Sequence, residues 1–265
     1  MSPRLPRLLL VGAGKMGGAM LQKLAGQVSA CVVDPAPPPA HLKSLKGVTW
    51  LTGPDKIDFH FAPDIVVIAI KPQQMASVLP AYMHFQDAVF LSIAAGQTLA
   101  RLEGMLGGCA IIRAMPNLPA SIGQGAAVAV ANKKVADAQR ALADKILGAI
   151  GTVAWMANEK LMDAVTALSG SGPAYVFALV ETMAKAGEAL GLPKDLATRL
   201  ARQTIIGSGA LLAQSAESAE NLRKAVTSPG GTTEAALEEL LDESGLPDLM
   251  LRTMEAAARR SKELS

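Results

Sequence analysis

The sequence predicts an α/β protein in which a doubly wound, mostly parallel N-terminal sheet is followed by an all-α region. Two observations carry this expectation. Apolar runs of strand length alternate with loops or helical stretches as far as residues 153–155, which is typical of parallel strands joined by crossovers. From about Glu159 onward, apolar residues recur only at helical spacing, interrupted by turns that contain Gly or Pro. We therefore expect two domains, at residues 1–157 and 158–265.

Composition narrows the kind of ligand. A chain of 265 residues is long enough for two domains, and 50% apolar residues with 18% charged residues exclude a disordered protein. With 3% aromatic residues and a net charge of +2, neither stacking platforms nor a basic stripe for nucleic acid is expected. No apolar run approaches the roughly 18 residues of a membrane-spanning helix. A small-molecule ligand, with no nucleic-acid or membrane partner, is the remaining expectation.

The N-terminus and the cysteines indicate the compartment. Arg4 and Arg7 ahead of the apolar residues 8–10 resemble a short signal peptide, but this run leads directly into Gly12, so we interpret it as a first strand. Cys31 and Cys109 are far apart and lack metal-ligand spacing, so neither a metal site nor a disulfide framework is indicated. A cytoplasmic protein is expected.

The predicted elements follow one another in a simple order. The apolar run at residues 8–11 leads into a Gly-rich turn and then into a helix marked by apolar residues at helical spacing. A second run closes on Asp34, and the prolines that follow it mark a surface loop. This second run lies at residues 30–33, and the further runs expected to be buried strands lie at residues 65–70, 89–93, 110–112 and 126–130.

The Gly-rich turn has the spacing of a dinucleotide site of the Rossmann type. In Gly12-x-Gly14-x-x-Gly17 the glycines permit the tight turn, a close approach of pyrophosphate and close helix packing, in that order. Asp34 follows about 20 residues later, where a carboxylate accepts hydrogen bonds from the ribose of NAD. No Arg follows it to bind a 2′-phosphate, so the pattern favours NADH over NADPH. The alternative is that Asp34 only caps the turn before Pro35.

Five further segments identify a family. Residues 69–72 (AIKP), 92–96 (SIAAG), 112–117 (IRAMPN), 169–175 (SGSGPAY) and 228–233 (SPGGTT) together resemble pyrroline-5-carboxylate reductase, in the family's order and approximate spacing. The resemblance runs from Gly12 to about Gly245. It implies a Rossmann domain, a helical dimerisation domain, rings built from dimers, and reduction of 1-pyrroline-5-carboxylate by NADPH or NADH as the last step of proline biosynthesis.

The resemblance also implies which residues bind the cofactor. By position, they are Val11, Gly12, Ala13, Gly14, Lys15, Met16, Asp34, Ala69, Ile70, Lys71, Pro72, Ala94 and Ala95. In a parallel sheet these segments follow the carboxyl ends of strands, where ligands bind. For Lys71 the alternative is a residue that only terminates a strand. For Arg113 and Asn117 the alternative is a turn that holds only its own loop.

The resemblance assigns substrate binding to the helical half of the chain. Residues 228–233 would hold the carboxylate and ring nitrogen of the imine through Gly231, Thr232 and Thr233, with Thr233 as the catalytic hydrogen-bonding group. Gly230 and Gly231 are expected to expose backbone N–H groups at a helix start, although an ordinary N-cap is the alternative. Glu159 matches a position near the substrate, where the alternative is a solvated carboxylate at a helix start.

Three other functions fit the sequence less well. A β-hydroxyacid dehydrogenase needs a catalytic Lys with an Asn about four residues later, but Lys185 is followed by Ala189. A non-catalytic NAD-binding module would not need the Gly230 to Thr233 loop. Hydrolysis by Ser169 or Ser171 would require a His, and the C-terminal half has none. The small-residue segment 206–210 allows close helix contact, either between subunits or within one.

Overall fold

The computed structural model describes residues 4–264 and divides them into two compact units. The first contains the residues up to Gly170 together with the stretch from Ala257 onward, and the second is Ser171–Ala256. The expected boundary was residue 157. The segment after it stays with the first unit because Glu159 and Ser169 hydrogen-bond to groups on or just after strand β6 (Ile111–Met115).

The first unit is built on one eight-stranded sheet with strand order β3-β2-β1-β4-β5-β6-β7-β8. All neighbours are parallel except β6 and β7, which are antiparallel. The strands are β1 (Arg7–Val11), β2 (Ser29–Val33), β3 (Val48–Leu51), β4 (Ile65–Ile68), β5 (Val89–Ser92), β6 (Ile111–Met115), β7 (Gly125–Ala131) and β8 (Gly151–Trp155). The predicted doubly wound sheet is confirmed.

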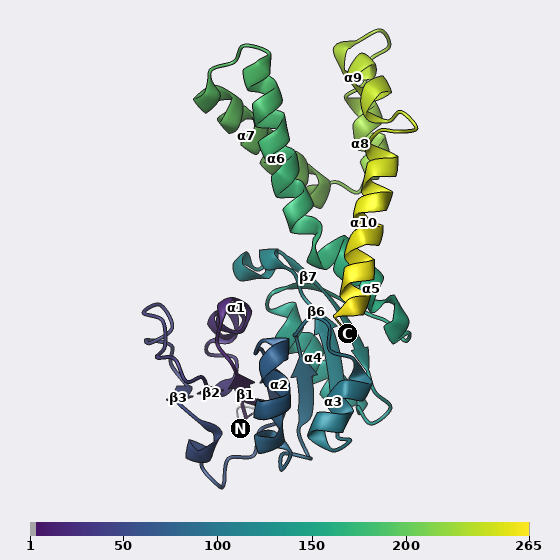
Figure 1. The fold of residues 1–265 in the computed structure, drawn as a ribbon. Helices are drawn as coiled ribbons and strands as arrows, with labels where there is room; N and C mark the ends of the chain where they lie inside the picture. Colours follow the sequence, from purple (N-terminus) through teal and green to yellow (C-terminus); the bar gives the residue numbers. More distant parts are fainter. Residues whose placement is uncertain (1–3, 265) are drawn as a thin grey trace. The chain divides into compact units, whose positions relative to one another are not determined.

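Helices cover both faces of this sheet (Figure 1). Side chains from alternate positions of β1 enter two separate cores: Leu8 and Leu10 pack with α1 and α4, whereas Leu9 and Val11 pack with α2 and α3. The helices are α1 (Lys15–Leu24), α2 (Pro72–Val78), α3 (Leu99–Leu106) and α4 (Asp137–Gly148). Shorter turns are η1 (Pro54–Lys56), η2 (Leu79–Tyr82), η3 (Leu118–Ile122), η4 (Glu159–Leu161), α5 (Met162–Val165) and η5 (Thr166–Gly170).

The second unit is helical, as predicted. It contains α6 (Gly172–Ala189), α7 (Lys194–Gln214), α8 (Ala219–Ala225), α9 (Thr232–Leu240) and the first part of α10 (Leu246–Glu263). Helices α6 and α7 pack as a pair through small side chains such as Ala184, Ala197 and Ala201. Many large apolar side chains of this unit stay exposed, among them Phe177, Ile206 and Leu211.

One strand, β3, has no counterpart among the predicted elements. It is four residues long, and none of its side chains is fully buried, so it shows neither an apolar run nor a regular alternation. It forms the sheet edge by pairing with β2, which a local pattern does not reveal. In the described part of the chain, no helix combines the length and the apolar character needed to cross a membrane.

Candidate active site

Four predicted cofactor segments meet at one edge of the sheet. Because β1, β2, β4 and β5 are parallel, their carboxyl ends all lie at this edge. Backbone hydrogen bonds join the segments that leave it: the Gly12 N–H donates to the Val33 carbonyl at 2.9 Å, and Ala69 N–H donates to the Val11 carbonyl at 2.8 Å. Ile93 N–H reaches the Ile68 carbonyl at 3.1 Å. The predicted cofactor segments therefore lie together at this edge: residues 11–16, Asp34, 69–72 and 94–95.

The three glycines of the turn have different surroundings. Gly12 has a φ of +88°, and a Cβ there would lie 2.7 Å from Ile70 Cγ2. A Cβ on Gly17 would lie 2.4 Å from the Gly12 carbonyl oxygen, so α1 packs directly against the turn. A Cβ on Gly14 would meet nothing within 4 Å and would project into open space. Gly12 and Gly17 shape the turn, and Gly14 leaves space beside it.

The start of α1 has the properties of a phosphate site. No side chain caps this helix, and among residues 4–264 no acceptor is found for the N–H groups of Lys15, Met16 and Gly17. A cavity of about 370 Å³ adjoins it, lined by Ala13, Gly14, Lys15, Gly18, Ala19, Gln22, Pro39, His41, Leu42 and Ser121. Open N–H groups and the helix dipole favour an anion. The pyrophosphate of a dinucleotide fits these residues.

Asp34 holds the fingerprint turn to the end of β2. Its Oδ2 accepts the Ala13 N–H at 2.7 Å, and its Oδ1 accepts the Ala36 N–H at 2.9 Å. Asp34 therefore does cap the turn that contains Pro35. Each carboxylate oxygen accepts two hydrogen bonds, so one position on each oxygen stays available to a ribose hydroxyl.

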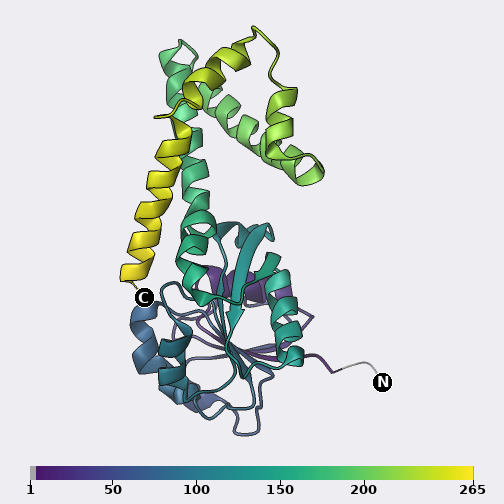
Figure 2. The same ribbon diagram turned by 90° about the vertical axis from the view of Figure 1, so that its right-hand side faces the viewer.

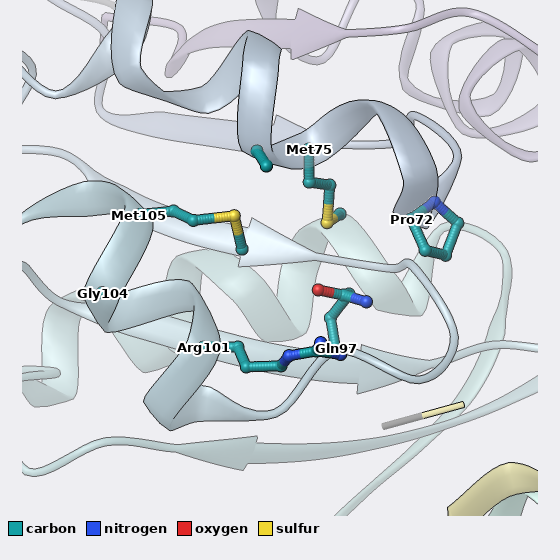
Figure 3. A pocket seen from close by; sticks show the side chains of 7 residues that line it. Pro72, Met75, Gln97, Arg101, Gly104 and Met105 are labelled. Atoms are coloured by element: carbon teal, nitrogen blue, oxygen red, sulfur yellow. The ribbon is translucent and has the colours of Figure 1, made fainter. Parts of the chain in front are cut away.

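Pro72, the last residue of the predicted segment after β4, lines a second cavity. Lys71 is exposed three residues beyond the end of β4, where it is the N-cap of α2, and Pro72 is the first helical residue. After β5, Ala94 is buried and Ala95 is exposed. A cavity of about 370 Å³ adjoins α2 and α3, lined by Pro72, Met75, Ala76, Gln97, Arg101, Gly104 and Met105 (Figure 3).

Arg113 and Asn117 form contacts well beyond their own loop. The Arg113 guanidinium, buried on β6, donates to Oε1 of Glu159 at 2.8 Å. Asn117 Nδ2 donates to the Ser169 carbonyl, and its Oδ1 accepts the Ala126 N–H. A charged residue inside an apolar strand is the one signal in the sequence that calls for a buried partner. It does not say that the partner is Glu159.

The loop before α9 corrects one expectation. Gly230 and Gly231 do not expose their N–H groups: Gly230 donates to Oε2 of Glu234 at 2.6 Å, and Gly231 donates to the Ser228 carbonyl at 3.0 Å. The backbone N–H groups that stay open belong to the next two residues. In the described residues no acceptor is found for the N–H groups of Thr232 and Thr233, the first two residues of α9.

The comparisons with known proteins agree with this geometry. Residues 159–264 match the family model described as pyrroline-5-carboxylate reductase dimerisation. Residues 7–96 match the model described as NADP oxidoreductase coenzyme F420-dependent. The chain is 38% identical to a pyrroline-5-carboxylate reductase of Pseudomonas aeruginosa, covering 98% of this chain and 97% of that protein. It is 36% identical to one of Pisum sativum, covering 96% and 94%.

Solved structures give the same result. A pyrroline-5-carboxylate reductase from Coxiella burnetii superposes with a TM-score of 0.88 at 34% identity, covering 97% of this chain and 98% of that one. A pyrroline carboxylate reductase from Plasmodium falciparum, solved with NADP bound, has a TM-score of 0.82 at 28% identity, with 98% of both chains covered. The chain belongs to the pyrroline-5-carboxylate reductase family, oxidoreductases that reduce 1-pyrroline-5-carboxylate to proline with NAD(P)H.

Proposed function

We propose that the start of α9 binds the carboxylate and ring nitrogen of 1-pyrroline-5-carboxylate and that Thr233 is the catalytic hydrogen-bonding residue. The observation that carries this proposal is the pair of open N–H groups on Thr232 and Thr233 at a helix N-terminus. These donors and the helix dipole suit a small carboxylate. Gly231 caps the same helix, and a Cβ there would lie 2.9 Å from the Ser228 carbonyl oxygen, so this residue keeps the turn tight.

The reaction needs little acid catalysis from the protein. A cyclic imine is basic enough to enter as an iminium, in which the C=N carbon already attracts a nucleophile. When bound, the reduced nicotinamide supplies the hydride that this carbon accepts. The C=N double bond becomes a single bond, and its electron pair passes to the nitrogen. The Thr233 hydroxyl holds this nitrogen and so orients the carbon to be reduced.

Glu159 is the proposed substrate residue outside the loop before α9. Both of its hydrogen bonds use Oε1, and Oε2 has no partner among residues 4–264. Its side chain is 27% exposed, and Oε2 is not fully buried. A carboxylate beside an iminium stabilises the cation and favours the protonated imine.

For the cofactor we propose the sheet edge described above, with NADH preferred. The pyrophosphate would lie at the start of α1 along residues 11–16, and the ribose hydroxyls at Asp34. Residues 69–72 and 94–95 would line the nicotinamide end. A 2′-phosphate beside Asp34 would meet a carboxylate and no Arg from the loop that follows it. This is the support for NADH.

Two observations support a homodimer in a reducing compartment. Segment 206–210 of α7 is exposed, and a Cβ on Gly207 or Gly209 would meet nothing within 4 Å, so the small residues are not used for packing within the subunit. Exposed apolar side chains on α6 and α7 add to this surface. Cys31 and Cys109 are free and buried, which suits the cytoplasm.

The test is an activity measurement with both cofactors. Purified protein is mixed with pyrroline-5-carboxylate and either NADH or NADPH, and oxidation of the nicotinamide is followed by its absorbance. We expect imine-dependent oxidation with a larger kcat/KM for NADH. A larger kcat/KM for NADPH refutes the interpretation of Asp34 alone. Binding of either cofactor without imine-dependent oxidation refutes the substrate assignment.

A further inference from the structure

The Arg113–Glu159 pair joins two distant parts of the first unit. Arg113 lies on β6 with a side chain only 5% exposed, and Glu159 begins η4, 46 residues later. Their 2.8 Å contact neutralises a buried guanidinium, which would be costly without a partner. The pair therefore fixes the Glu159 carboxylate in place.

The same carboxylate oxygen also holds the start of α3. Glu159 Oε1 accepts the N–H of Leu99, the first residue of this helix, at 2.8 Å. Thr98 Oγ1 accepts the Arg101 N–H at 3.2 Å. Two of the N–H groups that a helix leaves open in its first turn are thus satisfied. These two bonds determine where α3 begins, and hence where the β5–α3 loop of residues 93–98 ends.

The end of the chain contacts this loop as well. Gly96 has a φ of +69°, and a Cβ there would lie 3.0 Å from the Leu264 carbonyl oxygen. Ser261, 6% exposed, donates its hydroxyl to Oδ1 of Asp163 at 2.7 Å, one turn after Glu159. In Figure 2 the end of α10, beside the mark C, lies directly above the blue helices of the first unit. Segment 159–163 thus holds both the loop, through Glu159, and the chain end, through Asp163.

From these contacts we infer that Glu159, oriented by Arg113, is a positioning residue for the β5–α3 loop and thereby for the bound nicotinamide cofactor. The inference rests on the proposed function for the role of Ala94 and Ala95, which this loop carries. It goes beyond a substrate role for Glu159, because it predicts an effect on cofactor affinity when no imine is present. A purely structural ion pair would change the stability of the fold without changing cofactor affinity.

Two double variants isolate the bond to Leu99. R113M/E159Q and R113M/E159M both remove the buried charge together with its partner, so their net charges are equal. Only the glutamine of R113M/E159Q keeps an oxygen that can accept the Leu99 N–H. We expect the dissociation constant for the reduced nicotinamide, measured by fluorescence titration without imine, to be about 3- to 10-fold higher in R113M/E159M than in R113M/E159Q. The titration uses whichever of NADH and NADPH binds the wild type more tightly.

A second pair of variants keeps the ion pair intact. Leu99 is the first residue of α3, where Pro is tolerated, and Thr98 has the extended conformation that precedes Pro (ψ 157°). Leu99→Pro removes the N–H that Glu159 accepts, whereas Leu99→Ala shortens the side chain and keeps that N–H. We expect the dissociation constant for the cofactor to be about 3- to 10-fold higher in L99P than in L99A.

The outcomes separate the two proposals. Equal cofactor affinities in L99P and L99A, with both folded by circular dichroism, overturn the inference, whatever the double variants do. The same equality between R113M/E159Q and R113M/E159M also overturns it. Failure of the proposed reaction is seen separately, as cofactor binding by the wild type without imine-dependent oxidation.

Discussion

At the scale of single residues, Thr233 gives the sharpest test of the chemistry. Thr233→Ala removes the hydroxyl proposed to hold the imine nitrogen but keeps the backbone N–H. We expect turnover to fall by about 10- to 100-fold, since one positioned hydrogen bond is worth about 1.5–3 kcal/mol. Steady-state kinetics with saturating cofactor measures this.

Two neighbouring variants serve as controls for that experiment. Thr233→Ser keeps a hydroxyl and should recover most of the turnover. Thr232→Ala removes the adjacent hydroxyl and keeps the N–H proposed to bind the carboxylate, so it should change turnover by less than about threefold. Turnover of T233A within twofold of the wild type would exclude Thr233 from the mechanism.

Two buried groups make the stability of the first unit sensitive to alkaline pH. Burial raises the pKa of Cys31 from 9.0 to about 11. Burial, and then the nearby Cys31 thiolate, raise the pKa of Tyr82 from 10.0 to about 12. Above pH 9 the unfolded chain releases these protons before the folded chain does, so the unfolded state gains stability as pH rises.

We therefore expect the urea midpoint to be constant with respect to these groups up to about pH 8 and to fall between about pH 9 and pH 12. Cys31→Ala should reduce this slope, because it removes one of the two groups and the charge that acts on Tyr82. A midpoint that does not change up to pH 11 would contradict the prediction.

At the scale of elements, the strand–turn–helix unit separates fold from ligand binding. Gly17→Ala places a Cβ 2.4 Å from a backbone oxygen, so it should destabilise the fold by about 1–3 kcal/mol in urea unfolding. Gly14→Ala projects into open space, so stability should stay within about 1 kcal/mol of the wild type. Cofactor affinity of G14A should still fall about tenfold or more, because the added methyl occupies the approach of the pyrophosphate.

The comparison works because both variants add the same methyl group to one turn. Unfolding by urea and cofactor titration are measured on each protein. Unchanged cofactor affinity in G14A would show that the pyrophosphate does not approach this residue. Unchanged stability in G17A would mean that α1 can move away from the turn at little cost.

The strands differ in how well their own sequence predicts them. Strands β1, β4 and β5 are continuous apolar runs that follow from burial on both faces, and the sequence predicts them closely. The predicted run at residues 65–70 is longer than β4 because Ala69 and Ile70 continue the apolar pattern after the ladder ends. Strand β3 is stabilised by pairing with β2 at the sheet edge, so its side chains show no pattern of their own.

At the scale of the whole molecule, we expect self-association. Light scattering after size-exclusion chromatography should give the mass of a dimer or of a multiple of it. A double variant, G207E/G209E, adds charges where a Cβ meets nothing within the subunit, so it should keep helical circular dichroism while shifting the mass toward a monomer.

Gly148→Glu on α4 is the matched control, because its Cβ also meets nothing within 4 Å and it lies in the first unit. It should keep the wild-type mass. A wild-type mass for G207E/G209E would place the interface elsewhere, and a monomeric wild type would refute the dimer.

The sequence by itself determined the fold class, the dinucleotide fingerprint, the helical C-terminal region and the family, because each depends on a local pattern of apolar residues, glycines or motif residues. Tertiary structure alone decided which buried groups meet. Glu159 accepts hydrogen bonds from both Arg113 and Leu99. Asp34 accepts the N–H of Ala13, 21 residues earlier in the chain. Contacts such as Arg113–Glu159 join residues far apart in the chain. A buried charge or an open helix end finds its partner only where a distant segment folds back against it, and a local sequence pattern does not show which segment that is.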